Sequence, residues 1–142
     1  MSGSRSRSSA GSRRRAASAA LVAALVVACG GAGAADLVRG AELADARRWM
    51  DARAAFDRAI EADPASAAAF SGRCYVLVQL GDATGAIADC DRAIELDPAL
   101  AEAYVSRGMA RGQAGDEAGA LEDFSRAIEL DASFADAYTG RG

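Results

Sequence analysis

Residues 92–98 read Arg-Ala-Ile-Glu-Leu-Asp-Pro, and this stretch recurs along the chain with only small changes. Residues 58–64 read Arg-Ala-Ile-Glu-Ala-Asp-Pro, and residues 126–132 read Arg-Ala-Ile-Glu-Leu-Asp-Ala. The copies are 34 residues apart, and Gly81 and Gly115 keep the same interval. A fixed period of this length indicates a repeat architecture, in which each unit buries its apolar face only against its neighbours.

Each repeat predicts two helices joined by a tight turn. Phe70, Cys74 and Leu77 fall at positions i, i+4 and i+7, which lie on one face of a helix. Gly81 follows, and glycine suits the positive φ that often ends a helix. The apolar face of a second helix comes next and comprises Ala86, Ile87, Cys90, Ala93 and Ile94. Asp97-Pro98 ends this helix, because the residue before a proline is pushed out of the helical region.

The period and these residues resemble the tetratricopeptide repeat, a family of helix pairs. In the second unit the matching residues are Phe70, Gly81, Ala86, Ala93 and Pro98. In the third unit they are Tyr104, Gly108, Ala120, Phe124 and Ala127. The resemblance implies an all-α fold, an α-solenoid of antiparallel helix pairs that occupies residues 36–142. The units are expected at about 33–66, 67–100 and 101–134, with the start of a fourth at 135–142.

Residues 1–35 read as an export segment rather than as part of the fold. Five arginines and no acid precede Ala16, and an apolar run then extends to Ala28, which is the length of a signal-peptide core. Val26-Val27-Ala28-Cys29 resembles a bacterial lipobox, which makes Cys29 a candidate for lipidation. We therefore expect the repeats outside the cytoplasm, periplasmic or anchored to the membrane facing outward, with any membrane attachment through the N-terminus only.

Other readings of this segment stay open. Small residues at 33–35 suit an ordinary signal peptidase, and the uncharged stretch 16–35 could remain as an uncleaved anchor. The arginine- and serine-rich start also fits a mitochondrial transit peptide, which is the minor alternative for location. A disordered basic tail is the remaining interpretation.

The charge and composition exclude several classes of function. From Asp36 onward the chain has eleven arginines and twenty acidic residues, hence a net charge of −9, so we expect no nucleic-acid partner. Histidine is absent, which removes the commonest metal ligand and the usual general base. We therefore predict no enzyme activity, no catalytic residues, no cofactor and no metal site.

The resemblance implies that the first helices line a concave groove for a peptide or a partner protein. The groove positions are Leu37, Ala41 and Asp45 in the first unit, Ser71, Tyr75, Val78 and Gln79 in the second, and Glu102, Val105, Met109 and Gln113 in the third. Chaperone-binding members of the family hold a C-terminal carboxylate with lysine and asparagine, and this chain has neither residue type, so we predict that it does not take that role. The alternative for the groove residues is that some of them only pack on neighbouring helices.

Two further sets of residues depart from the family pattern. Cys74 replaces a small glycine and Cys90 an aromatic residue, and in the family's layout these positions lie on facing helices, so they either form a disulfide after export or remain two small buried residues. Arginine precedes the small position of each unit, at Arg39, Arg73, Arg107 and Arg141. These arginines either pair with Asp89 and Asp123 as a ladder or are solvated edge charges of little energetic weight.

The resulting functional expectation is a non-catalytic scaffold that recruits a protein or peptide partner. The alternative is a structural or self-associating segment, a fragment of a longer repeat array or of a multidomain protein.

Overall fold

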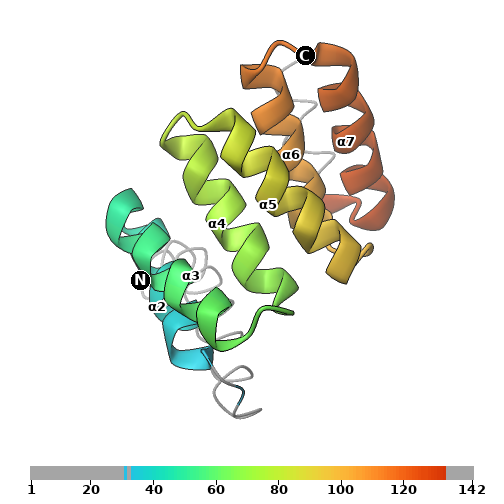
Figure 1. Ribbon diagram of the computed structural model, residues 1–142. Helices are drawn as coiled ribbons and strands as arrows, with labels where there is room; N and C mark the ends of the chain where they lie inside the picture. Colours follow the sequence, from blue (N-terminus) through green and yellow to red (C-terminus); the bar gives the residue numbers. More distant parts are fainter. Residues whose placement is uncertain (1–30, 32, 134–142) are drawn as a thin grey trace, which may run out of the picture.

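The computed structural model describes residues 31 and 33–133, which form six α-helices and no strand. The helices are α2 (Ala34–Asp45), α3 (Trp49–Ala62), α4 (Ala67–Gln79), α5 (Ala83–Leu96), α6 (Ala101–Gln113) and α7 (Glu117–Leu130). They follow one another as three antiparallel pairs (Figure 1), which confirms the expected all-α solenoid of helix pairs. The domain limits and unit boundaries stay predictions. Of the predicted export segment 1–35, residues up to 30 lie outside the described residues, whereas Ala34 and Ala35 belong to the first turn of α2. The predicted start of a fourth unit also lies outside the described residues.

Short side chains begin three of the helices. The side chains of Ser66, Asp82 and Asp116 each accept a hydrogen bond from the backbone N–H three residues further on, at 2.9–3.2 Å. This bond satisfies one of the backbone donors that a helix leaves unpaired at its start. Gly81 and Gly115 precede two of these caps with φ of 83° and 89°, a backbone conformation that glycine adopts without steric cost. The repeated glycine and aspartate therefore specify the turn within a pair.

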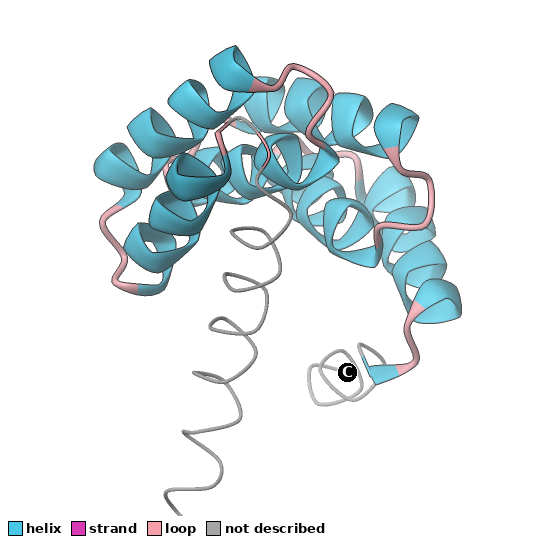
Figure 2. Cartoon of the chain, turned by 90° about the horizontal axis from the view of Figure 1, so that it is seen from below, coloured by secondary structure: helices cyan, strands magenta, loops and turns pink. Residues whose placement is uncertain are grey.

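The pairs stack into an arch (Figure 2). Each helix packs on the next one along the chain, and in addition α4 packs on both α2 and α6. The second helices α3, α5 and α7 do not contact one another, within the part of the chain that the structure describes. Because the first helices are closer together than the second helices, the stack curves with α2, α4 and α6 on its concave side.

Aromatic rings fill the space that glycines leave in the core. A Cβ placed on Gly40 or on Gly72 would lie 2.8 Å or 2.5 Å from the ring of Phe56, so this ring from α3 sits against the backbones of both α2 and α4. Gly108 stands in the same relation to the ring of Phe124. Interiors pack too densely to absorb an added methyl group at such contacts. These small residues thus set how closely the helices approach.

None of the helices in the described region is both long and apolar enough to cross a membrane.

Candidate functional site

The candidate site is an exposed stripe along two of the first helices. Helix α4 packs on α2, α3, α5 and α6, and α6 packs on α4, α5 and α7, so the concave face of both helices is the one turned away from the second helices. The accessible groove candidates are Tyr75 and Gln79 of α4 and Glu102, Val105, Met109 and Gln113 of α6. We call these six residues the concave stripe.

Within α4 the structure separates the four predicted groove residues into two groups. Tyr75 and Gln79 are exposed, Tyr75 with 38% of its surface accessible. Ser71 and Val78 are buried, and Val78 belongs to the core cluster with Leu77. Ser71 and Val78 therefore pack between helices, which is the alternative reading of the groove positions, and only Tyr75 and Gln79 can meet a partner from α4.

All four predicted residues of α6 reach the surface, although two of them also pack inward. Glu102 and Gln113 are exposed, whereas Val105 and Met109 are half-buried. Met109 packs against the core cluster of the second pair. The side-chain amide of Gln113 donates a hydrogen bond of 3.0 Å to the carbonyl oxygen of Val78, which ties the end of α6 to the end of α4. The stripe is thereby continuous from one pair to the next.

The first pair contributes less to this surface. Leu37 of α2 is half-buried and packs against the core cluster around Phe56, whereas Ala41 and Asp45 are exposed. Ala41 offers little side chain, so Asp45 is the main group that α2 adds to the concave side.

An aromatic pair that the sequence analysis did not single out supports the stripe. The ring centroids of Trp49 and Tyr75 are 5.9 Å apart with an interplanar angle of 74°, an edge-to-face contact. Trp49 is the first residue of α3 and packs against the core cluster of the first pair, so its contact supports the position of the Tyr75 ring. Trp49 and Tyr75 occupy different positions of the 34-residue repeat, so the period does not predict that they meet. Only their aromatic character points to a contact.

A second feature of the structure is a set of arginines that join neighbouring helix pairs. The guanidinium of Arg73 donates to both carboxylate oxygens of Asp89 at 2.6 Å and 2.7 Å, and to Asp57 of the preceding pair at 2.9 Å. Arg107 repeats this arrangement with Asp123 and Asp91, at 2.7–3.0 Å. Both arginines are thus part of a ladder rather than solvated edge charges.

The ladder extends only over these two arginines among the residues that are described. Arg39 makes just one ion pair, at 3.9 Å, with Glu42 of its own helix, because Ala55 occupies the position that Asp89 has in the next unit. Arg141 lies outside the described residues. The sequence pattern predicts Asp89 and Asp123 as partners, and the structure adds Asp57 and Asp91.

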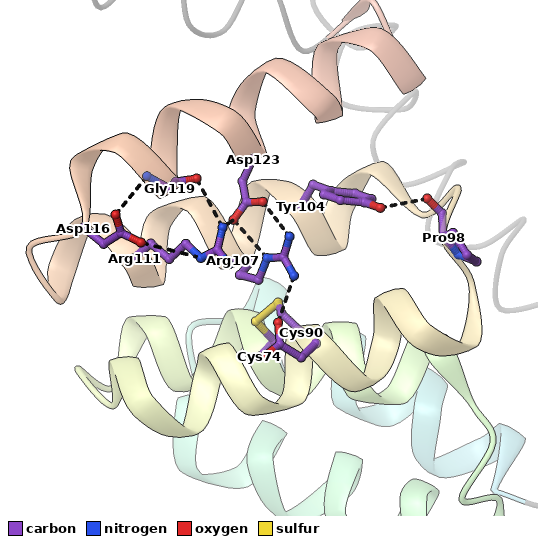
Figure 3. A network of polar contacts seen from close by, with 10 residues as sticks. Cys74, Cys90, Pro98, Tyr104, Arg107, Arg111, Asp116, Gly119 and Asp123 are labelled. Atoms are coloured by element: carbon purple, nitrogen blue, oxygen red, sulfur yellow. Dashed lines mark hydrogen bonds and ion pairs between the residues drawn. A yellow bond between two sulfur atoms is a disulfide. The ribbon is translucent and has the colours of Figure 1, made fainter.

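The ladder keeps its arginines charged. Hydrogen bonds to Asp89 and then to Asp57 raise the pKa of Arg73 above its ordinary value despite partial burial, and Asp123 and Asp91 do the same for Arg107. Arg111 adds a contact of 3.0 Å to Asp123, which brings two guanidinium groups to one buried carboxylate (Figure 3). Such a network has a structural role, because it joins helices of neighbouring pairs.

The two cysteines of the second pair face each other. Cys74 of α4 and Cys90 of α5 form a disulfide with their Cα atoms 5.5 Å apart, and neither residue is accessible to solvent (Figure 3). The oxidised state of this pair in the exported protein remains a prediction from the sequence. Cys29, the lipidation candidate, lies outside the described residues.

A metal site is not evident in the described part of the chain, where no three His, Cys, Asp or Glu side chains are grouped to hold an ion. The concave stripe itself contains one acidic residue, Glu102, and no basic residue. The stripe is therefore a weakly acidic surface with apolar side chains at its centre.

The chain was compared with known protein families and structures. The tetratricopeptide-repeat family matches residues 37–101 and again residues 101–134. No curated protein matches the chain at a significant level.

Three solved structures illustrate the similarity. The TPR2B domain of yeast Sti1, in a complex with pHsp70, is 30% identical with a TM-score of 0.67, over 77% of this chain and 87% of that one. The second TPR domain of human RPAP3, in complex with the HSP70 peptide SGPTIEEVD, is 28% identical with a TM-score of 0.63, over 68% and 81%. The TPR domain of Arabidopsis OM64 is 24% identical with a TM-score of 0.71, over 77% and 92%.

Proposed function

The chain belongs to the tetratricopeptide-repeat family, and from this premise we propose that it is a non-catalytic scaffold that binds a peptide segment of a partner protein outside the cytoplasm. The observation that carries the proposal is the concave stripe, where Tyr75, Val105 and Met109 present apolar surface on adjacent helices. Accessible aromatic and methionine side chains are typical of protein-binding surfaces. Two of the similar structures were solved as complexes, one of them with a peptide, which agrees with this role.

The charge of this surface favours a different peptide from the one bound by the human relative. That peptide, SGPTIEEVD, carries three acidic residues near its C-terminus. This chain has no lysine and no asparagine, and its repeats have a net charge of −9 from eleven arginines and twenty acids. Like charges at an interface disfavour association. We therefore propose a partner segment with apolar anchors and positive charge.

A matched pair of peptides tests this proposal. Fluorescence anisotropy would compare SGPTIEEVD with a version in which its three acidic residues are replaced by arginine. We expect the charge-reversed peptide to bind at least tenfold more tightly at low salt. Equal affinity for the two peptides would contradict the partner chemistry.

Substitutions distinguish a concave site from general attraction to an acidic protein. Tyr75→Ala removes an aromatic anchor from the stripe and is expected to weaken binding by about tenfold. Met50→Ala is the matched control, because Met50 is 65% exposed but lies on α3, a second helix. If the two variants bind alike, the peptide does not use the concave stripe.

Self-association is the second candidate, and one observation favours it. Leu121 on α7 is 67% exposed, whereas Ile87, which holds the same position one unit earlier, packs against the core cluster of the second pair. An apolar residue left open at the last described helix can pair with another copy. Sedimentation velocity of the chain and of Leu121→Glu tests this candidate. A monomer in both samples would exclude self-association.

A further inference from the structure

The disulfide occupies the place of a packing contact that recurs in the neighbouring pairs. In the first pair Gly40 lies against the ring of Phe56, and in the third pair Gly108 lies against the ring of Phe124. The equivalent residues of the second pair, 34 positions along from Gly40 and Phe56, are Cys74 and Cys90. A covalent bond thus replaces a ring that is wedged onto a glycine.

The surroundings of the bond extend its effect beyond its own pair. Both cysteines belong to a buried cluster that also contains Leu77 and Val78 of α4 and Ala110 of α6. Met109 of α6 packs against the same cluster, and Gln113 bonds to the carbonyl oxygen of Val78. The disulfide therefore lies where the second helix pair supports the first helix of the third.

We infer that the Cys74–Cys90 disulfide is a redox-dependent lock on the joint between the second and third helix pairs. In the oxidised chain the bond replaces the missing ring contact and joins α4 to α5, and α6 packs on the cluster that this bond holds in place. In the reduced chain neither a ring nor a bond joins α4 to α5 at this point. Two unbonded thiols need more room than a disulfide, and both cysteines lie in a densely packed cluster where neither of them has accessible surface. The joint consequently opens more often.

The electron balance of the step requires a dithiol. A dithiol transfers two electrons and two protons to the Cys74–Cys90 bond, which breaks to give two thiols, and the dithiol becomes its own disulfide. Because both sulfurs are buried, the reductant attacks only after a local opening of the helix pair. Reduction is therefore expected to be slow in the folded chain and fast when denaturant is present.

The experiment compares oxidised and reduced forms of the full chain by hydrogen exchange and urea unfolding. Each sample carries Cys29→Ser, so that this third cysteine cannot exchange with the pair. Dithiothreitol is the probe, and mass spectrometry verifies that two thiols form. We expect reduction to shift the unfolding equilibrium on the order of 100-fold toward the unfolded state. Amides of α4, α5 and α6 should exchange faster, with a smaller change in α2 and α3.

The matched control restores the packing of the neighbouring pairs. Cys74→Gly combined with Cys90→Phe places a ring against a glycine, as in Gly40 and Phe56, and without any disulfide it should keep the amide exchange of α4, α5 and α6 near the slow level of the oxidised chain. Should this double variant fail to fold, the comparison of the two redox forms of the chain with native Cys74 and Cys90 still decides the matter. Identical exchange of α4 to α6 in the two forms, with the thiols verified, would overturn the inference.

Discussion

At the scale of single residues, Arg47 carries an unusual backbone conformation. Its φ is 58°, and it occupies the turn position that glycine holds at Gly81 and Gly115 in the following units. A residue with a Cβ pays about 1–2 kcal/mol to adopt this left-handed region, whereas glycine adopts it freely. The first pair therefore turns at an energetic cost that the other two pairs avoid.

This cost leads to a prediction for the turn. Arg47→Gly is expected to raise the free energy of unfolding by about 0.5–1 kcal/mol, because the relief of strain exceeds the greater chain entropy of glycine. Urea titration followed by circular dichroism measures the change. Gly81→Arg is the reverse control and should destabilise, since the site has open space and only the backbone is strained. A loss of stability in Arg47→Gly would show that the arginine side chain itself supports the turn.

At the scale of helices, the ladder of Arg73 and Arg107 joins α4 and α6 each to the two second helices that flank it. Arg73 connects α4 to Asp89 of α5 and to Asp57 of α3. The raised pKa of its guanidinium means that this contribution to stability is fully present below the pKa of an unfolded arginine. It is lost only as the pH rises through the still higher folded value. The contribution of the arginine is therefore constant between neutral pH and the pKa of an unfolded arginine.

Removing one member of the ladder should be costly. Arg73→Met is expected to lower the free energy of unfolding by about 3 kcal/mol, because it leaves the carboxylate of Asp89 largely buried and without its cation. Arg92→Met is the control, since Arg92 pairs with Glu95 on an exposed surface and should change stability by less than about 1 kcal/mol. Thermal unfolding of both variants checks the difference. Similar unfolding midpoints for the two variants would show that the ladder does not stabilise the stack of helix pairs.

The sequence predicted the helices better than the contacts between units. The repeat pattern and the helical spacing can be read from the side chains of a single unit. The sequence therefore predicts the helix pairs and the partners Asp89 and Asp123. Asp57 and Asp91 belong to the preceding unit, and Trp49 reaches Tyr75 across a unit boundary. Such contacts depend on how one pair is placed on the next. The burial of Ser71 and Val78 has the same origin.

At the scale of the whole molecule, we propose that the repeats lie outside the cytoplasm. The proposal of an exported protein rests on residues 1–35, and the buried disulfide supports it, since disulfides persist mainly in oxidising compartments. In an exported protein, either cleavage removes the basic N-terminal segment from the acidic repeats, or a membrane anchor lies between the two.

Mass spectrometry of the mature N-terminus distinguishes the forms of attachment. A lipidated N-terminal residue at Cys29 would show a lipoprotein, and a free N-terminus at Asp36 would show an ordinary cleaved signal. An intact Met1 in the membrane fraction would show an uncleaved anchor. We expect one of these three forms. An intact Met1 in the soluble cytoplasmic fraction would contradict export.

The ladder also limits the order in which these units can be arranged. Arg73 and Arg107 each bond to a carboxylate of their own unit and to a carboxylate of the preceding unit. The first and second units therefore each supply one of the two carboxylates that the arginine of the next unit binds. A second copy of the middle unit could follow the first, because Asp91 would be in place for the next Arg73. A second copy of the third unit could not do so equally well, since Ser125 stands where Asp57 and Asp91 stand in the earlier units. Duplication within this gene would thus be tolerated more readily in the middle of the array than at its described end.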